Sequence, residues 1–147
     1  MSDAAPLTGD WRLRSWLSEV EDGSTRQPMG EGPVGILVYS PDGTMITTIA
    51  SAGRPALSSA DPLRGGPDDE RLRSAETFIA YSGSYAYDGV DVTHTVEMSL
   101  YPNWVGTRQV RHVRLSADGD TLELATDPVF MDGRRAVQRL TWERRSR

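Results

Sequence analysis

The chain has 147 residues, the usual size of one domain, and carries a formal net charge of −5 with no cysteine. The acidic balance argues against nucleic acid as a partner, and the absence of cysteine excludes thiol nucleophiles, iron–sulfur clusters and cysteine-ligated zinc. The N-terminus lacks a secretory signal pattern and no stretch is long enough to span a membrane, so we expect a cytoplasmic protein without a membrane partner.

The first half of the chain contains short segments in which apolar and polar side chains alternate. After a tail at residues 1–6, residues 11–17 alternate with the period of a half-buried strand. Residues 35–39 and 44–50 are the next two predicted strands, and the Ser-Pro-Asp-Gly sequence between them is typical of a tight turn. This pattern predicts a β-hairpin.

The middle of the chain departs from the strand pattern. Residues 51–67 are rich in Gly, Pro, Ser and Ala, which predicts a long loop that covers the mouth of the fold. Residues 68–70 are acidic, as a helix N-terminus favours, and an apolar helical face follows. That face comprises Leu72, Ala75, Phe78 and Ile79. We therefore predict one amphipathic helix of about three turns.

Strand signals resume after this helix and continue almost to the C-terminus. The predicted strands are residues 84–87, 91–101, 109–116, 121–126 and 136–143. An Asp-Gly pair joins the first two, which is a strong hairpin signal. The chain is therefore predicted to be all-β, with about eight antiparallel strands and one short inserted helix. Eight such strands close into a barrel that leaves no free edge and holds one small ligand.

Several runs of residues resemble the bacterial and fungal lipocalin-like domain family. They are Leu7–Leu13, Pro33–Met45, Arg54-Pro55, Gly83–Tyr85, His94, Pro102–Gly106 with Gln109 and Arg111, and Trp142–Arg144. The resemblance covers residues 7–144 and implies a single lipocalin-like β-barrel domain, with flexible tails at residues 1–6 and 145–147. It is less specific for activity, because microbial barrels of this kind include carriers as well as cofactor-free cyclases and isomerases.

Two candidate catalytic residues lie on predicted strands. His94 can be a general acid or base inside the barrel, or a histidine bonded to a neighbouring strand. Arg111 alternates with Val113 and Leu115 on a face with a buried pattern, so its guanidinium is expected to bind either a ligand anion or a structural carboxylate. Because His94 and His112 are the only histidines and their spacing forms no metal motif, neither a metal nor another cofactor is expected.

Two further candidate catalytic residues come from other parts of the chain. Arg54, expected at the mouth of the barrel, has the same two possible partners as Arg111, a ligand anion or a structural carboxylate. Tyr85 belongs to the Gly83-x-Tyr85 part of the family resemblance, and we expect its hydroxyl to point inward as a hydrogen-bond donor.

The candidate ligand contacts are apolar or aromatic. Alternation places Val96 and Met98, together with His94 and Leu100, on the inner face of their strand and Glu97 on the outer face, although a bulge would reverse this assignment. Aromatic candidates are Tyr39, Trp104 and Trp142, and core filling is the alternative role of the two tryptophans. Trp11 is expected to plug the closed end.

These observations leave three functional hypotheses. The first is a cofactor-free cyclase or isomerase that shapes a polyketide- or terpenoid-like substrate of secondary metabolism. The second is a non-catalytic carrier of a small apolar molecule. The third is a protein-interaction module. The oligomeric state stays open, with a homodimer as one possibility.

Overall fold

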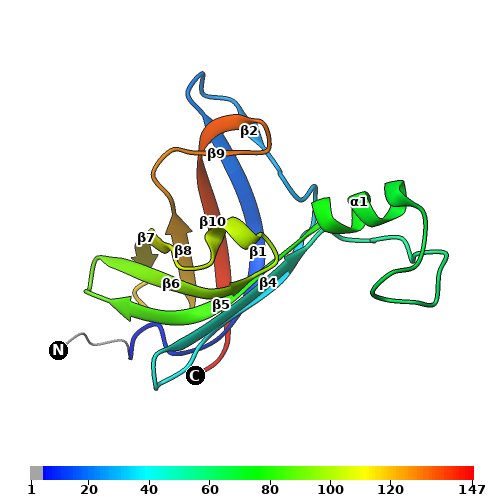
Figure 1. Ribbon diagram of the computed structural model, residues 1–147. Coiled ribbons are helices and arrows are strands. Elements are labelled where there is room, and N and C mark those ends of the chain that lie inside the picture. Colours follow the sequence, from blue (N-terminus) through cyan, green and yellow to red (C-terminus); the bar gives the residue numbers. More distant parts are fainter. Residues whose placement is uncertain (1–4) are drawn as a thin grey trace.

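The computed structural model describes residues 5–147, so most of the predicted N-terminal tail lies outside the described residues (Figure 1). The strands are β1 (Gly9–Val20), β2 (Thr25–Arg26), β3 (Val34–Tyr39), β4 (Thr44–Ala50), β5 (Phe78–Tyr87), β6 (Asp91–Ser99), β7 (Arg108–Leu115), β8 (Thr121–Ala125), β9 (Val129–Met131) and β10 (Arg134–Ser146). One helix, α1 (Asp68–Glu76), precedes β5, and one 3-10 turn, η1 (Pro102–Trp104), lies between β6 and β7.

Eight of these strands form a closed antiparallel barrel in the order β1-β3-β4-β5-β6-β7-β8-β10. The closing pair joins the first and last long strands, since β10 pairs with β1 from Asp10 opposite Ser146 to Val20 opposite Ala136. The short strands β2 and β9 extend the sheet beside β1 and β10. The predicted eight-stranded barrel with one short helix is confirmed.

The turns formed where the sequence predicted them. At the β3–β4 turn, Gly43 has φ of +94° and its N–H donates to the Ser40 carbonyl oxygen at 3.2 Å. Glycine suits this turn because the left-handed backbone region is unfavourable for residues with a Cβ. The Asp-Gly turn between β5 and β6 likewise contains Gly89 at φ of +94°. The local turn chemistry therefore set both hairpins.

The helix is shorter than predicted and packs differently. Its acidic first turn is confirmed, but no residue in α1 is buried and Leu72 is 61% exposed. Phe78 and Ile79 belong to β5, where they pair with Ala50 and Ile49 of β4, so the predicted helix end is wrong. Long-range pairing with β4 overrides the local helical period at these two positions. In Figure 1, α1 and the preceding loop project from the side of the barrel instead of covering its mouth.

A β-bulge interrupts the pairing of β5 with β6. Gly83 pairs with Val96 whereas Ser82 pairs with Met98, so Glu97 is the extra residue. The predicted inward faces of His94 and Val96 and the outward face of Glu97 are confirmed. The predicted inward face of Met98 is wrong, as is that of Leu100, because the bulge shifts the alternation and leaves Met98 70% exposed.

The barrel is sealed at the end where β1 begins. Trp11 is fully buried there, and its Nε1–H donates to the Leu7 carbonyl oxygen at 2.9 Å. The Arg144 guanidinium lies 4.2 Å above the Trp11 ring and donates to three backbone carbonyls. Those carbonyls belong to Pro6, Thr8 and Gly119. The expected plug is confirmed, and β10 continues through Ser146 into the segment predicted as a tail.

Candidate ligand-binding cavity

A cavity of about 370 Å³ opens into the barrel at the end away from the Trp11 seal. Residues of β9, of the start of β7 and of the segment between β8 and β9 contribute to its lining. The apolar and aromatic lining includes Trp16, Leu37, Ile49, Ile79, Tyr81, Trp104, Leu124, Leu140 and Trp142. The polar lining includes His94, Gln109, Arg111, Thr126, Asp127 and Gln138. This volume and this mixture of side chains are typical of sites for small organic ligands.

A buried histidine lies between two tyrosines in the cavity wall. His94 is 2% exposed; its Nε2 lies 2.6 Å from the Tyr39 hydroxyl and its Nδ1 lies 2.9 Å from the Tyr81 hydroxyl. A neutral imidazole has one N–H donor and one acceptor nitrogen, so one tyrosine donates to the ring and the other accepts from it. Tyr81 lines the cavity, while Tyr39 lies behind His94 in the core.

The environment keeps His94 and Tyr39 uncharged at neutral pH. Burial, together with the positive charge of Arg111, lowers the pKa of His94 to about 3. Burial also raises the pKa of the Tyr39 hydroxyl well above its ordinary value. With both ring nitrogens hydrogen-bonded to tyrosine hydroxyls and a pKa of about 3, His94 is a weak base.

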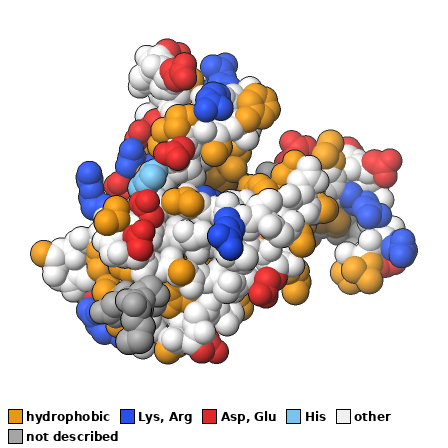
Figure 2. All heavy atoms as spheres, turned by 60° about the vertical axis from the view of Figure 1, so that its left-hand side comes forward, with side chains coloured by type: hydrophobic (Ala, Val, Ile, Leu, Met, Phe, Trp, Pro, Cys, Tyr) orange, Lys and Arg blue, Asp and Glu red, His pale blue; other side chains and the backbone are white. Residues whose placement is uncertain are grey.

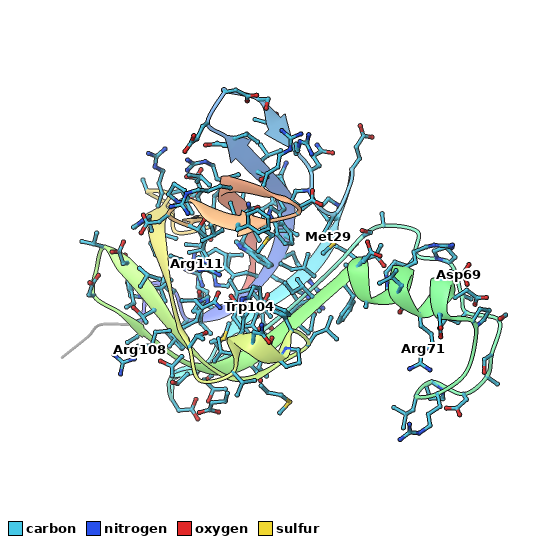
Figure 3. The ribbon with its side chains drawn as sticks, turned by 45° about the horizontal axis from the view of Figure 1, so that its top comes forward. Met29, Asp69, Arg71, Trp104, Arg108 and Arg111 are labelled. Carbon is cyan, nitrogen blue, oxygen red and sulfur yellow. The ribbon has the colours of Figure 1, made fainter. Side chains whose placement is uncertain are left out.

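Arg111 reaches the cavity from β7. Its Nη2–H donates to the Gln109 Oε1 at 2.9 Å and its Nη1–H donates to the Val110 carbonyl oxygen at 3.2 Å. Among residues 5–147 it forms no ion pair with a carboxylate, so of its two predicted partners the structural carboxylate is absent from the described part of the chain. Figure 3 shows Arg111 and Trp104 within the ring of strands. The guanidinium therefore keeps unused donors beside the cavity.

The two candidate tryptophans both line the cavity. Trp104, at the end of η1, meets the Tyr81 ring edge-on with 5.5 Å between ring centroids. Trp142, on β10, is 2% exposed, and its Nε1–H has no hydrogen-bond partner among the described residues. Gln138 differs, because its amide oxygen accepts from Trp16 and its amide nitrogen donates to Ser18. Trp142 thus contributes an unpaired donor to the wall.

Two predicted catalytic residues lie away from the cavity. Arg54 donates to the Thr77 hydroxyl at 3.1 Å and to Ser74 at 3.0 Å, which fastens the long loop to the end of α1. The Tyr85 hydroxyl donates to the Ser40 carbonyl oxygen at 2.7 Å, beside the β3–β4 turn. Both side chains are satisfied by local structural contacts and neither lines the cavity.

The two candidate apolar contacts, Val96 and Met98, both lie outside the cavity lining. Val96 is buried in the core without lining the cavity, and Met98 lies on the outer surface. Of the nine candidate residues, the structure brings four to the cavity wall, namely His94, Trp104, Arg111 and Trp142, with Tyr39 directly behind His94.

Comparison with known proteins agrees with this geometry. The family model described as "Lipocalin-like domain" matches residues 8–145. The chain belongs to the lipocalin-like domain family. A relative from Aspergillus oryzae (strain ATCC 42149 / RIB 40) is named 4'-hydroxy-3'-methoxypropiophenone carrier protein ppsC. It is 38% identical over 88 residues, and the match covers 54% of this chain and 78% of that protein. The fold and the relative's name support small-molecule binding by this barrel.

Sequence reasoning missed several lining residues of the lipocalin-like barrel. Tyr81 was missed because the predicted helix extended to Ile79 and the next predicted strand began only at residue 84. Continuing the alternation of Tyr85 backward through Gly83 would have placed Tyr81 on the inner face, where β5 holds it. Trp16 and Gln138 were missed because their hydrogen bond joins β1 to β10, 122 residues apart in sequence.

A charged cluster lies at the rim of the lipocalin-like barrel. His112 on β7 contacts Asp127 through Nε2 at 2.8 Å and Asp91 through Nδ1 at 2.9 Å. Figure 2 shows that acidic and basic side chains lie next to one another on one face of the molecule. Hydrogen bonds to Asp127, and then to Asp91, raise the pKa of His112. The cluster connects β6 and β7 to the segment that leads into β9.

Two searches of residues 5–147 found nothing. No group of three or more His, Asp or Glu side chains there is arranged to hold a metal ion. The one helix in this range is too short and too polar to cross a membrane.

Proposed function

We propose that this protein binds a small, largely apolar organic compound inside the barrel and carries it without changing it. The observation that supports this most strongly is the cavity of about 370 Å³, whose wall is mainly aromatic and aliphatic with a few oriented polar groups. The relative named as a carrier of a hydroxyaryl ketone suggests compounds of that class as ligands.

The hydrogen bonds around His94 favour a carrier over an enzyme. A general base must be free to accept a proton from the ligand and have a pKa near the working pH. Both His94 nitrogens are occupied by tyrosines, and the pKa of His94 is about 3. Arg54 and Tyr85, two of the other three candidates for polarising a substrate, are held outside the cavity.

A second candidate function is a cofactor-free cyclase or isomerase of secondary metabolism, and one observation favours it. The Tyr81 hydroxyl lines the cavity and is hydrogen-bonded to His94, in the same wall as the cationic Arg111. A hydroxyl backed by an imidazole can pass a proton, and a guanidinium can stabilise an enolate oxygen.

Calorimetric titration with a panel of hydroxyaryl ketones tests the binding proposal. We expect saturable one-to-one binding and a higher melting temperature, because a ligand that binds only the folded state stabilises it by about 2.7 kcal/mol at one hundred times its Kd. Ile79→Trp should fill part of the cavity and weaken binding at least tenfold. Val90→Trp, at an exposed position, is the matched control and should bind normally.

Two outcomes would refute the carrier. One is binding that Ile79→Trp leaves intact, since the ligand would then lie elsewhere. The other is chemical conversion of a bound compound that chromatography detects and Tyr81→Phe slows, which would favour the cyclase or isomerase. Stable capture of another polypeptide by a barrel that takes up none of these compounds would favour the protein-interaction hypothesis instead.

A further inference from the structure

The polar groups of the cavity wall separate into satisfied and unsatisfied ones. Gln138 is held by Trp16 and Ser18, and Tyr81 is held by His94. The Thr47 hydroxyl donates to the Ile36 carbonyl oxygen, and the Thr107 hydroxyl donates to the Trp104 carbonyl oxygen. These groups gain little from a ligand because protein atoms already occupy their main hydrogen-bonding directions.

Two side chains of the wall, Arg111 and Trp142, keep N–H donors without a partner among the described residues. A guanidinium carries five N–H bonds, and Arg111 uses two of them for Gln109 and the Val110 carbonyl. The Trp142 Nε1–H is buried with no acceptor among the described residues. A ligand oxygen would supply the acceptor that these spare donors lack.

The charge of Arg111 is also uncompensated within the described part of the barrel. Asp127 is the acidic residue in the lining, but its side chain is 82% exposed at the rim and is paired with His112. The positive charge of Arg111 contributes, after burial, to the lowered pKa of His94, so this charge lies close enough to act on the cavity wall. An anion placed beside it would be stabilised by the same interaction.

We propose that the cavity holds an aromatic ligand with one acidic oxygen as its anion, with that oxygen bound by the Arg111 guanidinium. This inference rests on the proposed binding function and specifies the ligand's charge. The aromatic part packs among Trp16, Trp104 and Trp142, and the ionisable hydrogen of the ligand leaves as a proton to bulk water. A planar guanidinium suits a delocalised oxyanion, such as a phenolate, because it can present two parallel N–H donors.

The test uses 4'-hydroxyacetophenone, a phenol whose absorption spectrum changes when it ionises, and its O-methyl ether, which cannot ionise. The spectrum of the phenol is followed against pH at saturating protein. The wild-type chain should lower the apparent pKa of the bound phenol by one unit or more, which corresponds to at least tenfold tighter binding of the phenolate than of the phenol.

Arg111→Met removes the charge at similar length and should abolish this shift, and Arg111→Lys should keep part of it. Arg114→Met, at the exposed position three residues further along β7, is the matched control and should behave as wild type. Arg111→Lys keeps the test valid if Arg111→Met fails to fold, because a lysine charge without a guanidinium fork should give a smaller shift than arginine.

The possible results separate the two proposals. An unchanged or raised apparent pKa in the wild type, or a full shift that persists in Arg111→Met, would overturn this inference. If the ether then binds as tightly as the phenol, the binding function stands while the anion is refuted. If neither compound binds, both proposals fail for hydroxyaryl ketones.

Discussion

Acidification should destabilise the barrel through His94. Burial and the charge of Arg111 lower the pKa of this histidine to about 3, whereas an unfolded chain has a histidine pKa near 6.5. Between these values the unfolded chain binds a proton that the folded chain does not. The stability that neutral His94 contributes is therefore complete above about pH 6.5 and is lost as the pH falls toward 3. At pH 5, which is about 1.5 units below the unfolded value, the loss amounts to about 2 kcal/mol at about 1.4 kcal/mol per unit.

Urea unfolding between pH 7.5 and pH 5 measures this loss. His94→Gln is the informative variant, because its amide keeps a donor and an acceptor for Tyr39 and Tyr81 but does not titrate. The wild type should lose about 2 kcal/mol more than the variant over this range. Taking the difference between the two chains removes the contribution of His112, which titrates in both. Equal pH slopes in the two chains would refute the argument that His94 is neutral and desolvated.

Three other predictions concern the rim, the bulge and the seal. The pKa of His112 is raised in the folded chain, so the stability that this histidine contributes is present below about pH 6.5 and is lost as the pH rises through the folded-state pKa. His112→Gln should remove this trend in thermal melts from pH 6 to 8.5. An unchanged trend would contradict the prediction. Gly83→Ala should lower the free energy of unfolding in urea by at least about 2 kcal/mol, since a Cβ there would lie 1.9 Å from a backbone oxygen of β6. A loss below about 0.5 kcal/mol would show that the backbone of the bulge can shift to make room. Arg144→Leu should lower the free energy of unfolding by about 3 kcal/mol in the same assay, because three backbone carbonyls lose a charged donor. The control Arg145→Leu, at the exposed neighbouring position, should change it by less than about 0.5 kcal/mol.

The hairpins could be predicted from sequence because their signals are local. A Pro-Asp-Gly or Asp-Gly turn between alternating segments specifies both the turn and the strands that flank it. The end of α1 could not be predicted in this way, since Phe78 and Ile79 fit a helical face as well as a strand. Pairing with β4, a segment almost thirty residues earlier, decides between the two.

The candidate site was predictable only in part, for a related reason. Alternation along single strands placed His94 and Arg111 inside, and the structure agrees. The hydrogen bonds that set the chemistry of His94 depend on how strands from distant parts of the chain are staggered around the barrel. Tyr39 is 55 residues from His94 in sequence, and no local pattern indicates that the two meet. The bulge that turns Met98 outward likewise depends on the partner strand.

The seal formed by Trp11 and Arg144 joins the first and last strands at the end of the barrel away from the cavity. The contacts that fasten the two ends of the chain are thus separate from the side chains that surround a ligand. Substitutions at the mouth can change which compound fits without disturbing this fastening, so the barrel is a suitable starting point for engineering new ligand selectivity.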